Sequence, residues 1–179
     1  LVADEVKAVR ERVGIIDVTA FAKVMVHEPQ AAALLDRLTA NRLPQKVGSI
    51  ALTHMLNRTG RIELEATILR MEEDRFYLVC AAFFEQRLLD HLNAHHMGQD
   101  LDIVSVSDAY SALALNGPKS RDVLGACTSA DLSNAGFRWM SAQKIKIAGH
   151  YVWAMRMSYA GELGWEIHMP NSACIDVYR

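Results

Sequence analysis

Three stretches in the first half of the chain alternate apolar and polar residues and are separated by very short turns. GSIALTHMLN (48–57) leads through RTG into RIELEATILR (61–70), which leads through MEED into RFYLVCA (75–81). Strands joined so closely must run antiparallel, because parallel neighbours need a crossover connection of about a dozen residues or more. The sequence therefore predicts a three-stranded meander between residues 48 and 81.

Two helical patterns flank this meander. The strand AKVMVHE (22–28) is followed by Pro29, which suits a first helical turn, and by AAALLDRL (31–38). The spacing of this segment predicts a helix whose apolar seam is Ala33, Leu34 and Leu38. A second helix is expected from about Ala82 to His96, with an inner face made of Phe84, Leu88, Leu89 and Leu92.

The second half of the chain repeats this order. Strands DIVSVS (102–107) and AYSALALN (109–116) precede a helix in KSRDVLGAC (119–127), and a second meander follows in QKIKIAG, HYVWAMRMSY and LGWEIHM. In the last strand, the alternation turns Trp165, Ile167 and Met169 to the apolar side and Glu166 to the other. Short strands, tight turns and interleaved helices predict an α+β fold with largely antiparallel sheets.

The two halves, about 20–100 and 101–179, share a weak internal repeat. VMVHEPQAAALLDRL and LALNGPKSRDVLGAC both read as strand, Pro and amphipathic helix. In each half a turn glycine also precedes a glutamate by five residues, Gly60 before Glu65 and Gly161 before Glu166. We expect the two carboxylates to occupy comparable places and, if the halves pack about a pseudo-twofold axis, to line one shared cavity.

Charge and cysteine usage exclude several classes of protein. The net charge is −2 and the isoelectric point is about 6.4, and scattered Lys and Arg argue against a nucleic-acid partner. No apolar run approaches the roughly 20 residues of a membrane span, and no signal-peptide pattern opens the chain. The isolated Cys80, Cys127 and Cys174 predict reduced thiols, as in the cytoplasm or, in a eukaryote, the mitochondrial matrix.

Several candidate sites have plain alternatives. Glu65 alternates with apolar residues and could belong to a solvated polar face, whereas Glu166, beside Trp165, could pair with Arg156. His91 and His95 have a zinc-ligand spacing but no evident third ligand, so we expect no metal site. There is no nucleophile elbow and no glycine-rich phosphate loop, so a nucleotide or flavin would be held outside this chain.

Four stretches together resemble a known family: RVGIIDVTAFAKVMVHEP, LDRLTANRLPQKVGSIALTHMLNRTGRIELEATILR, DLSNAGFRWM and SYAGELGWEIHMP. They are similar to the folate-binding region of the glycine cleavage T-protein (aminomethyltransferase) family, and most of all to its branch in dimethylglycine and sarcosine dehydrogenases. The resemblance covers nearly all of residues 1–179. It implies two ferredoxin-like antiparallel α+β units around a central folate pocket, without the small β-barrel that usually follows. Both ends of the sequence lie inside helical patterns, so we expect a fragment.

The resemblance also assigns residues. Glu65 matches the family's acidic residue near the reactive folate nitrogens, although the T-protein pattern has Asp there, and is the expected catalytic residue. Glu166 and Tyr159 match the motif that holds the pterin ring, Met55 and Leu56 are expected to contact folate, and Glu162 is expected to serve the turn. A folate-binding arginine of the family falls beyond residue 179.

The implied activity is one-carbon transfer, from an N-methyl or aminomethyl donor to tetrahydrofolate, giving 5,10-methylenetetrahydrofolate. FAD is implied only where a flavin domain is fused to this chain or partners it. A folate-binding or regulatory module without turnover is one alternative. A methyltransferase or demethylase that uses tetrahydrofolate with another donor is a second.

Overall fold

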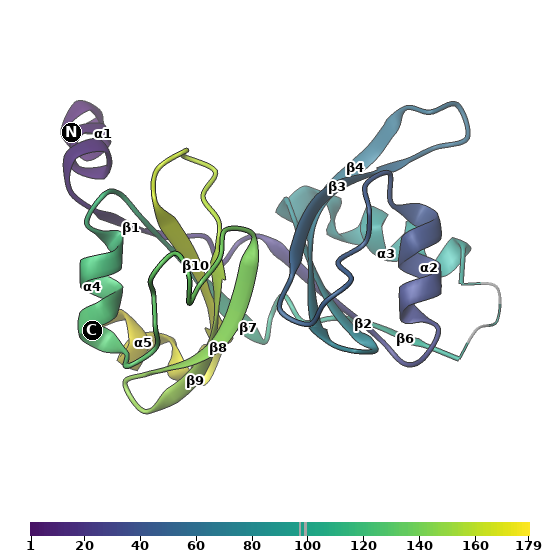
Figure 1. Ribbon diagram of the computed structural model, residues 1–179. Coiled ribbons are helices and arrows are strands. Elements are labelled where there is room, and N and C mark those ends of the chain that lie inside the picture. The colour runs from purple at the N-terminus through teal and green to yellow at the C-terminus, as the bar shows by residue number, and fades with distance from the viewer. Residues whose placement is uncertain (97, 99) are drawn as a thin grey trace. The chain divides into compact units, whose positions relative to one another are not determined.

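The computed structural model describes residues 1–96, 98 and 100–179, which form two compact units. One unit is Ala20–Asp108, and the other combines Leu1–Thr19 with Ala109–Arg179. Each unit has a five-stranded sheet whose paired neighbours run antiparallel, with helices packed on it (Figure 1). The predicted α+β fold of two antiparallel units is confirmed. Among the described residues, no helix is long and apolar enough to span a bilayer.

The unit Ala20–Asp108 contains the first predicted meander. Its sheet has the order β3-β4-β5-β2-β6. In chain order, the elements are β2 (Ala22–His27), α2 (Ala31–Leu38), β3 (Ile50–Leu56), β4 (Ile62–Glu72), β5 (Arg75–Cys80), a 3₁₀ turn (Ala82–Phe84), α3 (Glu85–Ala94) and β6 (Asp102–Ser105). The second expected helix is thus a 3₁₀ turn followed by a shorter α-helix. Helices α2 and α3 cover one face of the sheet (Figure 1).

The core of this unit lies between that sheet face and the two helices. Leu34 and Leu35 of α2, and Leu88 and Leu92 of α3, are fully buried against β2, β3, β4 and β5. The prediction was wrong for Ala33, which is exposed. The helix instead turns Ala31 toward the sheet, one helical turn before Leu34 and Leu35.

A β-bulge changes the expected alternation at the start of β4. Met55 of β3 pairs with Leu64, but the next residue of β3, Leu56, pairs with Ile62. Glu63 is therefore the extra residue of the bulge. Ile62 is consequently 62% exposed, whereas strict alternation from the buried Leu64 would turn it toward the core. Glu63 instead reaches Arg87 on α3, and the hydrogen bond from that guanidinium holds the pKa of Glu63 below its usual value. Beyond the bulge, Glu65 alternates with the buried Leu64 and Ala66, as its place among apolar residues predicted.

The second unit has the sheet order β1-β7-β10-β9-β8. Its elements are α1 (Val2–Glu11), β1 (Gly14–Asp17), β7 (Tyr110–Asn116), α4 (Ser120–Cys127), β8 (Ser141–Ile147), β9 (His150–Arg156), β10 (Gly164–Pro170), a 3₁₀ turn (Asn171–Ala173) and α5 (Cys174–Tyr178). Trp165, Ile167 and Met169 face a core with Leu124 of α4 and Phe137, as the alternation predicted. Gly117 lies against the end of α1, where a Cβ would come within 2.6 Å of the Arg12 carbonyl oxygen.

The two sheets share a topology, but the glutamates are not equivalent in it. In each unit a strand and a helix precede a three-stranded meander, so β3, β4 and β5 correspond to β8, β9 and β10. Glu65 lies on the middle meander strand, β4, and Glu166 lies on the last, β10. The turn at Gly60 precedes the middle strand of one meander, whereas the turn at Gly161 precedes the last strand of the other. The expectation that the two glutamates occupy comparable places was therefore wrong. The edge strand β6 also belongs with the unit Ala20–Asp108, rather than with the second half.

Candidate functional site

Glu65 lies on the sheet face turned away from α2 and α3. Its direct neighbour across the strand pair is His54 of β3, and His54 Nε2 is 3.0 Å from Glu65 Oε2. The two side chains are 41% and 52% exposed. The carboxylate therefore has one imidazole partner and remains open to solvent. It can still take up a proton or accept a hydrogen bond from a ligand.

The two residues expected to contact folate from β3 lie on opposite faces. The side chain of Met55 is fully buried in the core with Leu64. Leu56 is 39% exposed on the other face. Only Leu56 can therefore present its side chain on the same face as Glu65, whereas Met55 supports that strand from the core side.

Glu166 lies on the sheet face turned away from α4 and α5. Its register neighbours are Ala114 of β7 and Met155 of β9. The Glu166 side chain is only 15% exposed, and its Oε2 is 3.3 Å from Nε2 of the buried His168. Its other oxygen, Oε1, has no hydrogen-bond partner among the described residues. The alternative pairing with Arg156 is not formed, because Arg156 lies on the helix side of the sheet.

Other residues of the SYAGELGWE stretch lie in the loop before β10. Tyr159 is fully exposed, so it could contact only a ligand bound at the surface of this loop. Glu162 accepts a hydrogen bond from Arg10 of α1, and the Ala160 carbonyl oxygen accepts another. Glu162 therefore ties the loop to the amino-terminal helix, in keeping with the structural role expected for it.

Sequence reasoning missed the two histidines that contact the candidate carboxylates. His168 follows Glu166 by two residues, so strand periodicity places both on one face, and this signal was available. His54 meets Glu65 through the pairing of β3 with β4, and its identification requires the register of that hairpin. Both carboxylates are thus paired with an imidazole on the face opposite the helices.

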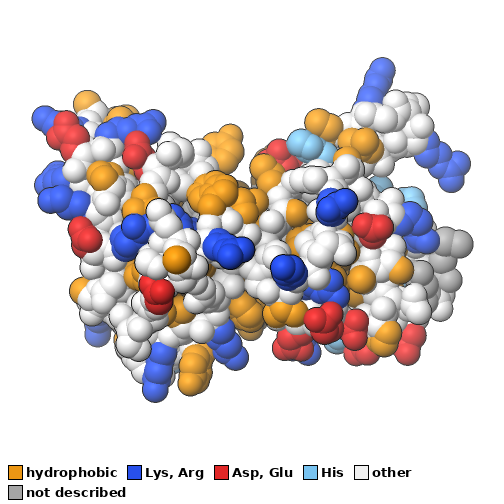
Figure 2. Space-filling model, in the orientation of Figure 1, with side chains coloured by type: hydrophobic (Ala, Val, Ile, Leu, Met, Phe, Trp, Pro, Cys, Tyr) orange, Lys and Arg blue, Asp and Glu red, His pale blue; other side chains and the backbone are white. Residues whose placement is uncertain are grey.

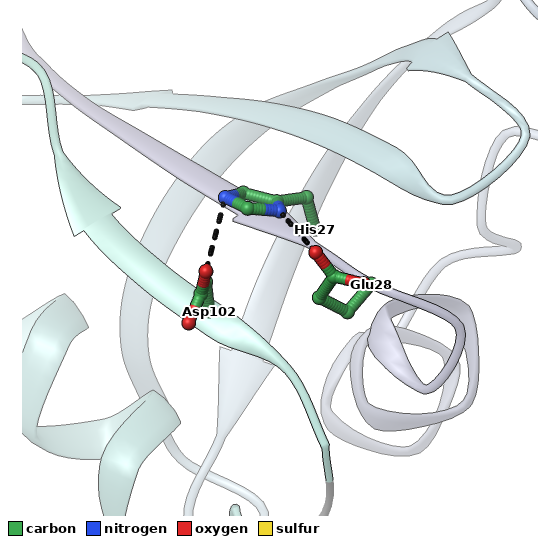
Figure 3. A group of neighbouring side chains, drawn as sticks. All are labelled: His27, Glu28 and Asp102. Atoms are coloured by element: carbon green, nitrogen blue, oxygen red, sulfur yellow. Dashed lines mark hydrogen bonds and ion pairs between the residues drawn. The ribbon is translucent and has the colours of Figure 1, made fainter.

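A second group of titratable side chains lies where β2 ends beside the start of β6. His27 lies between two carboxylates, with Nδ1 3.2 Å from Glu28 and Nε2 3.6 Å from Asp102 (Figure 3). Ligand atoms from these three residues lie within 4.8 Å of one another. The two carboxylates approach different nitrogens of the His27 ring, so a cation would have to replace one of these contacts.

An open hollow of about 370 Å³ adjoins this group. It is lined by His27, Glu28, Pro29, Glu72, Glu73, Asp74 and Arg75. Acidic side chains gather along the lower edge of this unit in Figure 2, while Lys and Arg are scattered over the visible surface. The hollow shares no residue with the predicted folate-binding set.

The predicted histidine pair on α3 has a different environment. His95 Nδ1 is 2.8 Å from the carbonyl oxygen of His91. Burial, and then the nearby His95, lower the pKa of His91. Among the described residues, these two histidines belong to no three-residue group with metal-binding geometry.

Comparison with known proteins supports the architecture. The family described as the GCVT N-terminal domain matches residues 1–179. The chain is 36% identical to mitochondrial dimethylglycine dehydrogenase of Mus musculus over 99% of its length, and 31% identical to mitochondrial sarcosine dehydrogenase of the same species over its whole length. It spans only 21% of each of these relatives.

Solved structures show the same fold. Aminomethyltransferase T of the glycine cleavage system from Bartonella henselae superposes with a TM-score of 0.82 at 23% identity. The alignment covers 97% of this chain and 47% of that protein. The resemblance to aminomethyltransferases and methylglycine dehydrogenases deduced from sequence motifs is therefore confirmed.

Proposed function

Because this chain belongs to the GCVT N-terminal domain family, we propose that it binds tetrahydrofolate for transfer of a one-carbon unit at the oxidation level of formaldehyde. The observation that carries this proposal is the burial of Glu166 and its contact with His168. Its carboxylate is largely buried beside Ala114 and Met155, with one oxygen held by His168. Ligand pockets are typically apolar with a few well-placed polar groups, and this surrounding fits that description.

Glu166 suits a ligand that carries two adjacent N–H donors. A pterin presents an amino group beside a ring N–H, and a carboxylate can accept both in parallel. Ala114, the register neighbour of Glu166 on β7, has a short side chain that adds little bulk beside the carboxylate. In this proposal Glu166 orients the pterin, while His168 holds the carboxylate in place.

Glu65 has a different proposed role. When bound, tetrahydrofolate supplies the amine nitrogens that take up the one-carbon unit, with loss of water or amine, to give 5,10-methylenetetrahydrofolate. A carboxylate near those nitrogens can accept the proton released as the new C–N bond forms, and it can stabilise developing positive charge. The half-exposed Glu65, with His54 as a neighbouring proton carrier, fits this role.

The one-carbon donor is proposed from the relatives, whose names include dimethylglycine and sarcosine dehydrogenases. In this proposal, a flavin domain fused to or partnered with the chain oxidises an N-methyl donor with FAD. An aminomethyl donor would need no such domain. The proposed location is the mitochondrial matrix, or the cytoplasm in a bacterium, and it is supported by the word mitochondrial in the names of the two dehydrogenases.

A calorimetric titration of the complete natural polypeptide with tetrahydrofolate tests the proposal. We expect saturable heat and a higher melting temperature, because a ligand that binds the folded state stabilises it. The matched control is p-aminobenzoylglutamate, which lacks the pterin and should bind much more weakly. Absence of both heat and thermal shift with tetrahydrofolate would contradict the folate proposal. Binding without turnover of any N-methyl or aminomethyl donor would favour the regulatory module.

A further inference from the structure

Two arginines converge on one amide oxygen on the helix side of the second sheet. Arg121 Nη2, from the first turn of α4, and Arg156 Nη2, from the end of β9, each donate to Asn134 Oδ1 at 2.7 Å. Their guanidinium carbons lie 6.0 and 5.9 Å from the Trp165 ring centre. All four residues belong to the unit that contains Ala109–Arg179.

The charges of this arginine cluster, defined as Arg121, Arg156, Asn134 and Trp165, are not balanced within the described residues. Neither arginine forms an ion pair there, and the other bond of Arg156 goes to the carbonyl oxygen of Phe137. Asp131, in the same loop as Asn134, accepts a hydrogen bond from the Ser133 backbone instead. Burial, and then the charge of Arg121, lower the pKa of Arg156. Arg121 and Arg156 therefore share only neutral acceptors. This is unusual for a guanidinium group as buried as that of Arg156, which is 8% exposed.

The cluster also contains donors that lack acceptors. Arg121 Nε, Arg156 Nε and Trp165 Nε1 are buried and have no hydrogen-bond partner among the described residues. A buried donor without a partner destabilises the folded state, and a charged one does so more strongly. Unsatisfied donors of this kind are rare in native proteins, and a bound ion can supply the missing acceptors. Here the three donors and the charge imbalance occur around the same indole ring.

We propose that the arginine cluster binds a small oxyanion, either a carboxylate or a tetrahedral anion such as phosphate. An oxyanion supplies acceptor oxygens for N–H donors and neutralises the paired guanidinium groups, which match its geometry bidentately. Asn134 is exposed and Arg121 is partly exposed, so an anion can approach from that side. Glu166 points to the opposite face of the sheet, so this site is separate from the proposed folate contacts.

Nuclear magnetic resonance gives a site-specific test on this chain. The indole N–H of Trp165 is one of three in the sequence, and Trp165→Phe identifies its signal. Titration with phosphate, sulfate and acetate at constant ionic strength, with chloride as the reference, should shift that signal saturably. A larger effect of phosphate and sulfate indicates a tetrahedral ligand, and a larger effect of acetate indicates a carboxylate.

Three variants decide the outcome. Arg121→Gln, at a partly exposed position, should weaken binding by about tenfold or more through loss of a charge-assisted contact. Lys144→Gln, which removes a positive charge from an exposed position of β8, should leave the binding unchanged. Asn134→Asp places a carboxylate between the arginines, and should raise the melting temperature and abolish the response to added anions. The proposal fails if the Trp165 signal does not move in wild type, or moves equally in Arg121→Gln.

Discussion

The two candidate carboxylates face away from the helices of their units, yet their surroundings differ. Glu65 is half exposed and meets His54 across a strand pair. Glu166 is largely buried and meets His168 two residues along the same strand, where His168 itself is 1% exposed. A buried, oriented carboxylate suits the holding of a ligand, and an accessible one suits the exchange of protons. Burial therefore distinguishes two glutamates that the sequence had placed in equivalent positions.

The largest effect is expected for a substitution at Glu65. Glu65→Gln keeps the size of the side chain but removes its ability to take a proton. Formation of 5,10-methylenetetrahydrofolate by the complete polypeptide should slow by about 10²-fold or more, as for loss of general-base assistance. Single-turnover kinetics measures this rate, and folate affinity should change little. A wild-type rate in this variant would show that Glu65 takes no part in the chemical step.

A smaller effect is expected at Glu166. Glu166→Gln replaces one acceptor oxygen with a donor that would face the donors of the pterin. The dissociation constant for tetrahydrofolate should rise by about tenfold or more, because a mismatched buried hydrogen bond costs about 1–3 kcal/mol. Calorimetry measures the affinity, and Glu162→Gln in the adjoining loop is the matched control. Equal affinities of Glu166→Gln and wild type would contradict the docking role.

Local periodicity predicted those parts of the fold that depend on neighbouring residues. Alternation placed Trp165, Ile167 and Met169 in the core, and short turns predicted both meanders. It failed at Ile62, because a bulge is an insertion into the strand pairing and leaves the local pattern of residues unchanged. It also missed β1, whose pairing with β7 joins residues about a hundred positions apart.

The site was less predictable than the fold for the same reason. Glu65 and Glu166 came from resemblance to a family, which identifies positions but not surroundings. His168 could have been found from its spacing to Glu166, whereas the convergence of Arg121 and Arg156 on Asn134 depends on the packing of α4 and a loop against the sheet. Contacts between distant segments are decided by tertiary structure, and no local pattern specifies them.

The smallest effect is expected on stability, when each of the two histidines is replaced. His168→Gln removes a buried group that contacts Glu166, and should lower the free energy of unfolding by about 1–3 kcal/mol. His54→Gln breaks a solvent-exposed pair, which is worth about 0–1 kcal/mol. Urea denaturation of both variants measures the difference, and salt should affect only the small His54 contribution appreciably, because exposed pairs are screened. If both variants lose the same free energy of unfolding, burial does not decide how much each pair contributes to stability. If His168→Gln also weakens tetrahydrofolate binding while His54→Gln does not, the imidazole beside Glu166 positions the carboxylate that docks the ligand.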